Sequence, residues 1–137
     1  PKMRWCVDNM WTDSPVEPLL PGLRRIADTM PPAPSHALWL CWHPKRKRED
    51  MAFSLEGKNY LAAYGEWKNP ADDAKYANWA TECIGSMYQH GKGIQLADEN
   101  LGRRPAKFLS DENFARLQKI RAKYDPDNRF NSWRGTL

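Results

Sequence analysis

"MRWCVDNMW", residues 3 to 11, is the stretch from which the fold can be predicted. Trp5 and Trp11 share one parity of a loose alternation, which is typical of a β-strand with one apolar face. Arg4 and Asp8 share the other parity and predict an ion pair on the strand surface. The chain is therefore expected to begin with a strand whose two faces differ.

The next segments predict a helix, a second strand and a loop. Apolar residues recur at helical spacing in "LLPGLRRIADTM", so a helix is expected from about Pro21 until "PPAPS" stops it. "HALWLCWH", from His36 to His43, is almost wholly apolar and predicts a central strand covered on both faces. The basic run "PKRKRED" then predicts a solvated hairpin loop, with a nucleic-acid contact as the alternative.

The second half of the chain repeats the alternation of strand and helix. "MAFSLEGKNYLAAYGEW" predicts one long strand or two pieces broken near Gly57. A helix is expected from Asn69, its cap, to Gly91, and "KGIQLAD" predicts a fourth strand. A last helix is expected over residues 111–124, capped by Ser110 and ended by a proline.

The order strand, helix, strand, strand, helix, strand predicts an α+β fold of the ferredoxin-like type. Such a fold is an antiparallel sheet with two helices on one face. We expect residues 1–96 to form this domain and residues 97–137 to form a C-terminal helix and an aromatic tail. Because two helices suffice to cover one face of a small sheet, Phe130 and Trp133 are expected to pack on another domain.

Composition restricts the class of protein. With 137 residues, 28% charged and a net charge of +4, the chain is expected to be globular. It has no apolar run of membrane-spanning length and no signal-peptide pattern, so a cytoplasmic location is predicted. Cys6, Cys41 and Cys83 are odd in number and widely spaced, so each is predicted to be a small buried residue rather than part of a disulfide or a metal site.

The strand alternation also suggests a functional face. If Leu38 faces the helices, Trp39, Cys41 and His43 face away from them, and Tyr60, Tyr64 and Glu66 share a parity opposite to Leu61. Aromatic and ionisable groups on an uncovered sheet face indicate a lid over a ligand, an ordinary interface between copies or a solvated sheet face. The candidate residues are Tyr60, Tyr64 and Glu66 for catalysis, and Trp39 and His43 for substrate binding.

One segment carries a family resemblance. "ADENLGRRPAKFLSDENFARLQKIRAKYDPDNRF", residues 97–130, resembles the C-terminal end of FAD-linked oxidoreductases of the vanillyl-alcohol-oxidase superfamily, especially the berberine-bridge-enzyme-like branch. The most specific part of the match is Arg116-Leu117, Ile120, Tyr124-Asp125-Pro126, Asn128 and Phe130. Upstream, the expected order of elements agrees with the substrate (cap) domain of that family.

The resemblance implies that the sheet covers the isoalloxazine ring of an FAD held by a separate domain. The substrate is then oxidised by hydride transfer to the flavin, and the last helix and tail return to the FAD domain. On this reading Arg103 meets a flavin phosphate or a carboxylate substrate. Asn128, which follows Pro126, is expected to tie the turn together through its side-chain amide. The resemblance makes it a cofactor-binding candidate beside Arg103, because that turn seats the tail on the FAD domain. The chain lacks a glycine-rich phosphate loop, so it is expected to be inactive alone.

The implied partners are an FAD-binding domain or subunit and a small-molecule substrate. Two other classes stay open. One is a non-enzymatic ferredoxin-like binding module that forms dimers through its open sheet face. The other is a nucleic-acid binder that uses the basic run from Pro44 to Arg48.

Overall fold

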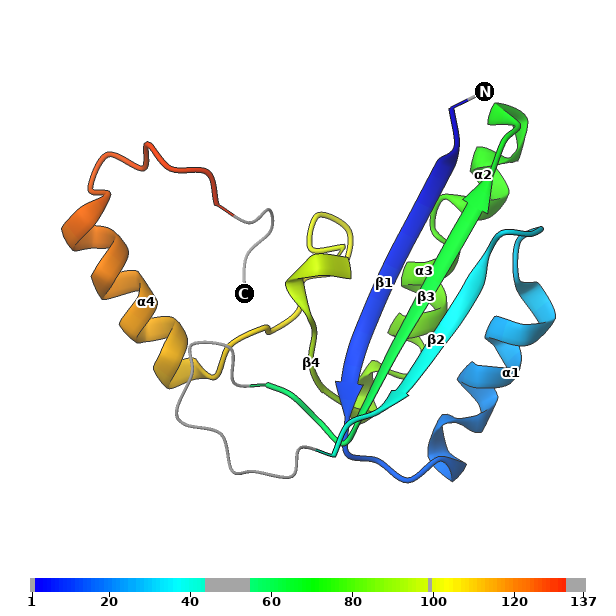
Figure 1. The fold of residues 1–137 in the computed structure, drawn as a ribbon, viewed down its shortest axis with the longest axis horizontal. Helices are drawn as coiled ribbons and strands as arrows, with labels where there is room; N and C mark the ends of the chain where they lie inside the picture. Colours follow the sequence, from blue (N-terminus) through cyan, green and yellow to red (C-terminus); the bar gives the residue numbers. More distant parts are fainter. Residues whose placement is uncertain (1, 44–54, 99, 133–137) are drawn as a thin grey trace.

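The computed structural model describes residues 2–43, 55–98 and 100–132, and its centre is one antiparallel sheet (Figure 1). The strands lie in the order β2-β3-β1-β4, and the helices follow β1 and β3 in the chain. This is the ferredoxin-like arrangement, so the predicted fold class is confirmed. The strands are β1 (Arg4–Thr12), β2 (His36–Cys41), β3 (Asn59–Trp67) and β4 (Gly91–Gly93).

Helices α1 (Leu20–Thr29) and α3 (Trp79–Gly85) cover one face of the sheet. The region from 69 to 91 is not the single helix that was expected, because it divides into short pieces around α2 (Asp73–Tyr76) and α3. Arg103 explains one break. Its Nη1 donates to the Ala77 carbonyl and the Asn78 side chain, so it binds groups that an unbroken helix would arrange differently.

The main core lies between these helices and the sheet. Gly65 of β3 shows how closely the layers approach, because a Cβ there would lie 2.9 Å from the Cys6 Sγ and 3.0 Å from the Trp79 ring. A side chain at this position would push α3 off the sheet. The buried members of the core are Cys6, Met10, Leu19, Ile26, Leu61, Ala63, Trp67, Tyr76, Trp79, Ala80, Cys83, Ile84 and Met87.

Strand β2 is at the edge of the described sheet, so the prediction of a central strand was wrong. It pairs with β3 alone, and all six of its residues are exposed. The register places Trp39 opposite Leu61, and therefore Trp39 and Cys41 lie on the helix side. The expected facing was inverted, and Cys41 is exposed, whereas the other two cysteines are buried as expected. An apolar run predicts apolar surroundings but does not give the position of the strand in the sheet.

The fourth strand is shorter than the predicted one. Only residues 91–93 pair with β1, and the chain then continues along the edge of β1 without a regular ladder. The Asn9 side chain takes the place of the ladder. Its Oδ1 accepts the Gln95 N–H at 2.7 Å, and its Nδ2 donates to the Gln95 carbonyl at 3.0 Å.

Helix α4 (Asp111–Tyr124) has the predicted bounds, and the Ser110 side chain caps it by accepting the Asn113 N–H. It lies apart from the sheet (Figure 1), and none of its residues is buried. Phe114 and Leu117 are half-buried against a second apolar cluster, which consists of Ile94, Leu101, Ala106, Phe108 and Leu109. The basic run and Trp133 lie outside the described residues. In the described part of the chain, none of the helices has the length and hydropathy of a membrane span.

Candidate functional site

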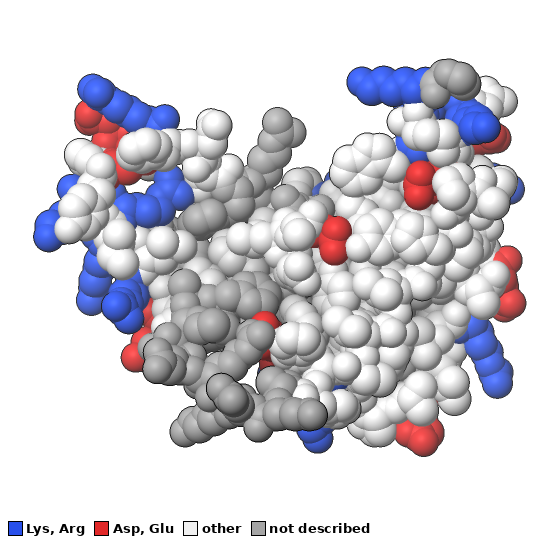
Figure 2. Space-filling view, viewed as in Figure 1, with Lys and Arg blue, Asp and Glu red and all other residues white. Residues whose placement is uncertain are grey.

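The sheet face opposite α1 and α3, called the open face here, carries the candidate site. Strand pairing places Tyr60, Tyr64 and Glu66 on it, as their shared parity predicted, because their neighbours Leu61 and Ala63 belong to the helix-side core. Figure 2 looks onto this side and shows a wide surface over the strands with few charged side chains, whereas Lys and Arg gather at the edges.

A tyrosine–carboxylate pair lies on the open face. The buried Tyr60 hydroxyl donates to the Asp98 Oδ2 at 2.7 Å. Tyr64 is half-buried four residues further along β3, and its ring stacks on His36 with 4.6 Å between the ring centroids. Burial, followed by the hydrogen bond and the negative charge of Asp98, raises the pKa of Tyr64 to about 12 and raises the pKa of Tyr60 further. Both phenols are therefore proton donors at neutral pH.

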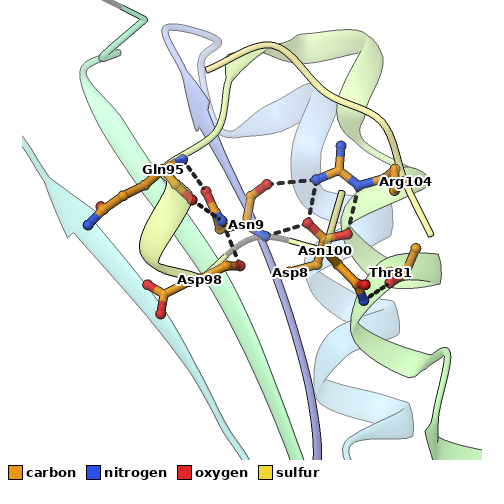
Figure 3. A network of polar contacts seen from close by, with 7 residues as sticks. All are labelled: Asp8, Asn9, Thr81, Gln95, Asp98, Asn100 and Arg104. Atoms are coloured by element: carbon orange, nitrogen blue, oxygen red, sulfur yellow. Dashed lines mark hydrogen bonds and ion pairs between the residues drawn. The ribbon is translucent and has the colours of Figure 1, made fainter. Parts of the chain in front are cut away.

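Asp98 is held in place by the first strand. The Nδ2 of Asn9 donates to the Asp98 carbonyl at 2.7 Å, and the same side chain binds the backbone of Gln95 (Figure 3). Asn9 is fully buried, so a central residue of the sheet fixes the turn that presents the carboxylate. The short turn Leu96–Asp98 is thereby anchored beside Tyr60.

A buried ion pair anchors the next part of the same segment. Arg104 binds the fully buried Asp8 carboxylate through two nitrogens, at 2.7 and 2.5 Å (Figure 3). Its guanidinium lies 4.4 Å from the centre of the Tyr88 ring. Burial raises the pKa of Asp8, and the Arg104 guanidinium opposes that rise. The predicted Arg4–Asp8 pair was wrong, because Arg4 pairs with Asp73 instead. Arg104 therefore has a structural role.

The end of the open face near β4 is hollowed into an apolar groove of about 400 Å³. The Trp11 ring borders it and packs on Tyr60 with 4.8 Å between the ring centroids. Leu40 of β2 lies opposite Tyr60 in the register, so the groove crosses the ends of three strands. Its lining includes Trp11, Leu40, Trp42, Glu56, Gln95 and Leu96.

The remaining predicted residues lie elsewhere. Trp39 is on the helix side, so the structure does not bring it to the open face as expected. His43 is exposed beyond the end of β2. Arg103 lies at the α2–α3 break and borders a hollow near Arg4, away from the tyrosine pair. Glu66 is half-buried on the open face opposite Trp5.

Asn128 contributes backbone conformation to the turn after α4. Its φ is +51°, in the left-handed region that asparagine tolerates. The tie itself is made by the buried Asp125, whose carboxylate accepts the N–H groups of Arg129 at 2.6 Å and Phe130 at 3.2 Å. This corrects the expectation that the asparagine amide ties the turn, and it explains the "YDPDNRF" sequence as a chain reversal.

Sequence reasoning missed Asp98, Trp11 and His36 as site residues. Asp98 follows the short fourth strand in a turn, and no periodicity indicates which strand residue such a turn meets. The parity of Trp11 in the first strand grouped it with Trp5, with which it shares a face in the structure, but it did not indicate which face of the sheet that is.

The described residues include the close glycine pair Gly91 and Gly93. The close glycine pair serves packing, because a Cβ at Gly93 would lie 2.6 Å from the Leu55 Cβ and one at Gly91 would lie 3.0 Å from the Tyr88 ring. In the described part of the chain there is no cluster of three or more metal-ligating side chains. What the open face offers is an aromatic wall with hydroxyl and carboxylate groups.

Comparison with known proteins agrees with this arrangement. Residues 75–135 match the family model "Berberine and berberine like", which covers α3, the anchored turn and α4. The structure is similar to that of 6-hydroxy-D-nicotine oxidase from Arthrobacter nicotinovorans, with a TM-score of 0.66 at 17% identity, over 94% of this chain and 31% of that one. At this identity the likeness shows the fold.

The curated proteins to which the chain is similar are FAD-linked oxidoreductases. The chain is 27% identical to the FAD-linked oxidoreductase janO of Penicillium janthinellum over 100% of its own length, and 27% identical to the FAD-linked oxidoreductase penO of Penicillium crustosum over 92%. It spans 30% and 28% of the length of these two relatives.

Proposed function

We propose that this chain is part of a berberine-like FAD-linked oxidoreductase and forms the substrate-side wall of a flavin enzyme whose FAD is held by a region outside it. The observation that carries the proposal is the open face, where an aromatic surface with few charged side chains surrounds the Tyr60–Asp98 pair and α1 and α3 lie on the opposite side. A surface of this kind suits a planar ring system and an organic substrate.

The reaction class is a two-electron oxidation of a small organic substrate. A C–H hydrogen leaves with its electron pair as hydride, and a proton leaves the neighbouring oxygen or nitrogen. Bound FAD supplies the hydride acceptor. The half-buried Tyr64 is placed to receive the substrate proton as its hydroxyl gives its own proton to Asp98, whose carboxylate acts on both tyrosines.

Tyr60 is a positioning residue in this scheme. It is only 3% exposed, and its hydroxyl fixes the Asp98 carboxylate from below. Glu66 is a second candidate base because it lies on the same face and is half-buried. Comparing Asp98→Asn with Glu66→Gln separates the two, since our scheme expects the slower flavin reduction, by about 100-fold, from Asp98→Asn.

The C-terminal arm, residues 110–132, is proposed to dock on the FAD-holding region. Ile120 is 45% exposed, Tyr124 is 68% exposed and Phe130 is 72% exposed, so the arm presents apolar side chains to solvent. The Asp125 turn fixes the direction in which Phe130 leaves the helix. In this proposal residues 1–96 are the cap and the segment from 97 onward connects it to the rest of the enzyme.

The outer edge of β2 favours a second arrangement, in which another strand pairs with it. Because the Trp42 N–H donates to the Lys58 carbonyl, alternation turns the N–H groups of Ala37, Trp39 and Cys41 to the free edge. Leu38 and Leu40 are also exposed. A free apolar edge pairs readily with another strand, either of the same enzyme or of a second copy.

The test is reconstitution. The chain is co-expressed with the part of the Penicillium janthinellum relative that lies outside the matched 30%, and the purified material is examined for flavin absorption. We expect a yellow complex that contains both polypeptides. If the chain folds but purifies as a homodimer, without flavin and without the second polypeptide, the proposal is contradicted and the binding-module alternative is favoured.

A matched pair of variants tests the arm. Ile120→Glu places a charge on the proposed docking stripe, whereas Ala115→Glu places the same charge on an exposed position of another helix face. We expect Ile120→Glu to weaken complex formation at least about tenfold and Ala115→Glu to leave it within about twofold, since burying an unpaired charge is costly.

A further inference from the structure

The N-terminal half of β1 has a free edge, which the pairing of β3 reveals. The Glu66 N–H donates to the Ser35 hydroxyl at 2.8 Å, and that hydroxyl donates to the Glu66 carbonyl at 3.1 Å, so both backbone groups point toward β2. Trp5 lies opposite Glu66, and the residues of an antiparallel pair point their backbone groups either toward each other or apart. The backbone groups of Trp5 therefore point away from β3, and those of Val7 do the same by alternation.

The other half of this edge is occupied. Trp11 pairs with β4, and the Asn9 carbonyl accepts from the Arg104 Nη2 at 2.9 Å. Among the described residues, by contrast, none forms a hydrogen bond with the backbone of Trp5 or Val7 on this side of β1. Figure 1 likewise shows no strand beside this half of β1 on the side away from β3. An unpaired strand edge is a template for a further strand.

A hollow of about 560 Å³ lies along the free edge. One wall includes Trp5 and Val7, and a second wall includes Asn100 and Arg103. Arg104, the next residue, binds β1 from the free-edge side, so the second wall lies across the edge from the first. The volume is within the range of ligand-binding pockets, and it leaves room beside the edge for a short stretch of extended chain.

The hollow has an excess of positive charge. The charged side chains that line it are Lys2, Arg4, Arg103 and Asp73. Asp73 accepts hydrogen bonds from the Arg4 guanidinium and from the Trp67 Nε1, so its charge is compensated. Arg103 donates to uncharged oxygens at the α2–α3 break, and within the described residues neither Arg103 nor Lys2 forms an ion pair with a carboxylate. Two positive charges beside the free edge therefore favour an acidic group in the hollow.

The edge and the charge together select one occupant. A second copy paired edge to edge would bring two sets of Lys2 and Arg103 together, and a small anion would leave the edge unpaired. We propose that an extended segment of the FAD-holding region adds to the free edge of β1 as a strand and places an acidic side chain against Lys2 and Arg103. The inference rests on the proposed function, because it requires that this region join the chain.

A proline substitution tests the pairing, because it removes one backbone donor from the free edge. Trp5 is 68% exposed and its N–H points away from β3, so Trp5→Pro leaves the hydrogen bonds between β1 and β3 intact. Trp5→Ala is the matched control, since it loses the same side chain but keeps the N–H. In the reconstitution with the Penicillium janthinellum relative, we expect Trp5→Pro to form the yellow complex at least about tenfold more weakly than Trp5→Ala.

A charge reversal tests the acidic contact. Lys2 and Arg24 are both exposed cations, but only Lys2 lines the hollow. We expect Lys2→Glu to weaken the complex about three- to tenfold, because an attraction becomes a repulsion, and Arg24→Glu on α1 to change it less than about twofold. Arg103 is less suited to this test, because it also binds the α2–α3 break. If circular dichroism shows that Trp5→Pro fails to fold, the comparison of Lys2→Glu with Arg24→Glu decides the proposal.

The outcomes distinguish this inference from the proposed function. If the parent chain forms a yellow complex and Trp5→Pro joins it as tightly as Trp5→Ala, or Lys2→Glu as tightly as Arg24→Glu, the inference is overturned and the proposed function stands. If the parent chain forms no yellow complex, the proposed function fails and the inference fails with it. Sedimentation velocity of the chain alone detects a second copy. Self-association that Trp5→Pro abolishes and Trp5→Ala retains would assign the edge to that copy and would also overturn the inference.

Discussion

The two faces of the sheet use alternate residues of the same strands for different purposes. On the covered face, Leu61, Ala63 and Trp67 of β3 pack against helices and belong to a continuous core. On the open face, Tyr60 and Tyr64 of the same strand meet a carboxylate and have no helix above them. Because successive side chains of a strand point to opposite faces, β3 supplies core residues to one face of the sheet and candidate site residues to the other.

The carboxylates of the two faces make the same contrast. Asp8 points to the covered side, is fully buried and is neutralised by Arg104. Asp98 lies beside the open face and accepts a hydrogen bond from a phenol, and no salt bridge joins it to a cation of the described residues. The first carboxylate holds the segment that carries the second in place.

The largest difference is expected between alanine substitutions of two tryptophans that lie on opposite faces of the sheet. Trp79 is 5% exposed and its Nε1 donates to Thr29, whereas Trp5 on the open face is 68% exposed. Trp79→Ala should lower the free energy of unfolding by about 3–5 kcal/mol. Trp5→Ala should change it by no more than about 0.5 kcal/mol. Urea unfolding followed by circular dichroism measures both, and equal losses would contradict the assignment of the faces.

Removing the partner of the buried carboxylate should have an effect of similar or slightly smaller size. Arg104→Leu leaves Asp8 buried without a cation, and we expect a loss of about 3–4 kcal/mol in the free energy of unfolding. Adding Asp8→Asn to this variant should recover part of the loss. A double variant as unstable as the single one would show that the arginine acts through packing instead.

Glycine substitutions test the close approach of layers on the covered face. Gly65→Ala should lower the free energy of unfolding by about 1–3 kcal/mol, because the added Cβ meets Cys6 and Trp79. Gly102 is the control, since a Cβ there would meet nothing within 4 Å. Gly102→Ala should change stability by less than about 1 kcal/mol. A tolerated Gly65→Ala would mean that α3 lies less tightly on β3.

The smallest effect is a dependence of stability on alkaline pH that comes from the open face. The ordinary phenol pKa is 10.0, and Tyr64 titrates at about 12 in the folded chain. The stabilisation that comes from the raised pKa of the folded state is complete below pH 10. It is lost as the pH rises through about 12. Stability should therefore fall over this interval. The fall should be shallower in the variant with both Tyr60→Phe and Tyr64→Phe, and an identical fall would contradict the raised pKa values.

Much of the fold was predictable because local signals agreed with it. Ser110 and the helix over 111–124 were predicted with their observed bounds, and the order of elements gave the ferredoxin-like class. The position of β2 was not predictable, because an apolar run is compatible with a central strand or with an edge that something else covers. Asp98 was missed for a related reason, since its role depends on Asn9, which is 89 residues distant in the chain.

The central claim is that the open face becomes the wall of a flavin site. In a Cys41→Ser background, Leu38→Cys and Asp28→Cys place single reporters on the open face and on the exposed side of α1. Maleimide labelling rates are then compared for the chain alone and for the yellow complex. We expect the complex to slow labelling at position 38 at least about tenfold, because covered thiols react slowly, and to leave position 28 unchanged. Equal labelling at position 38 in a flavin-containing complex would contradict the account.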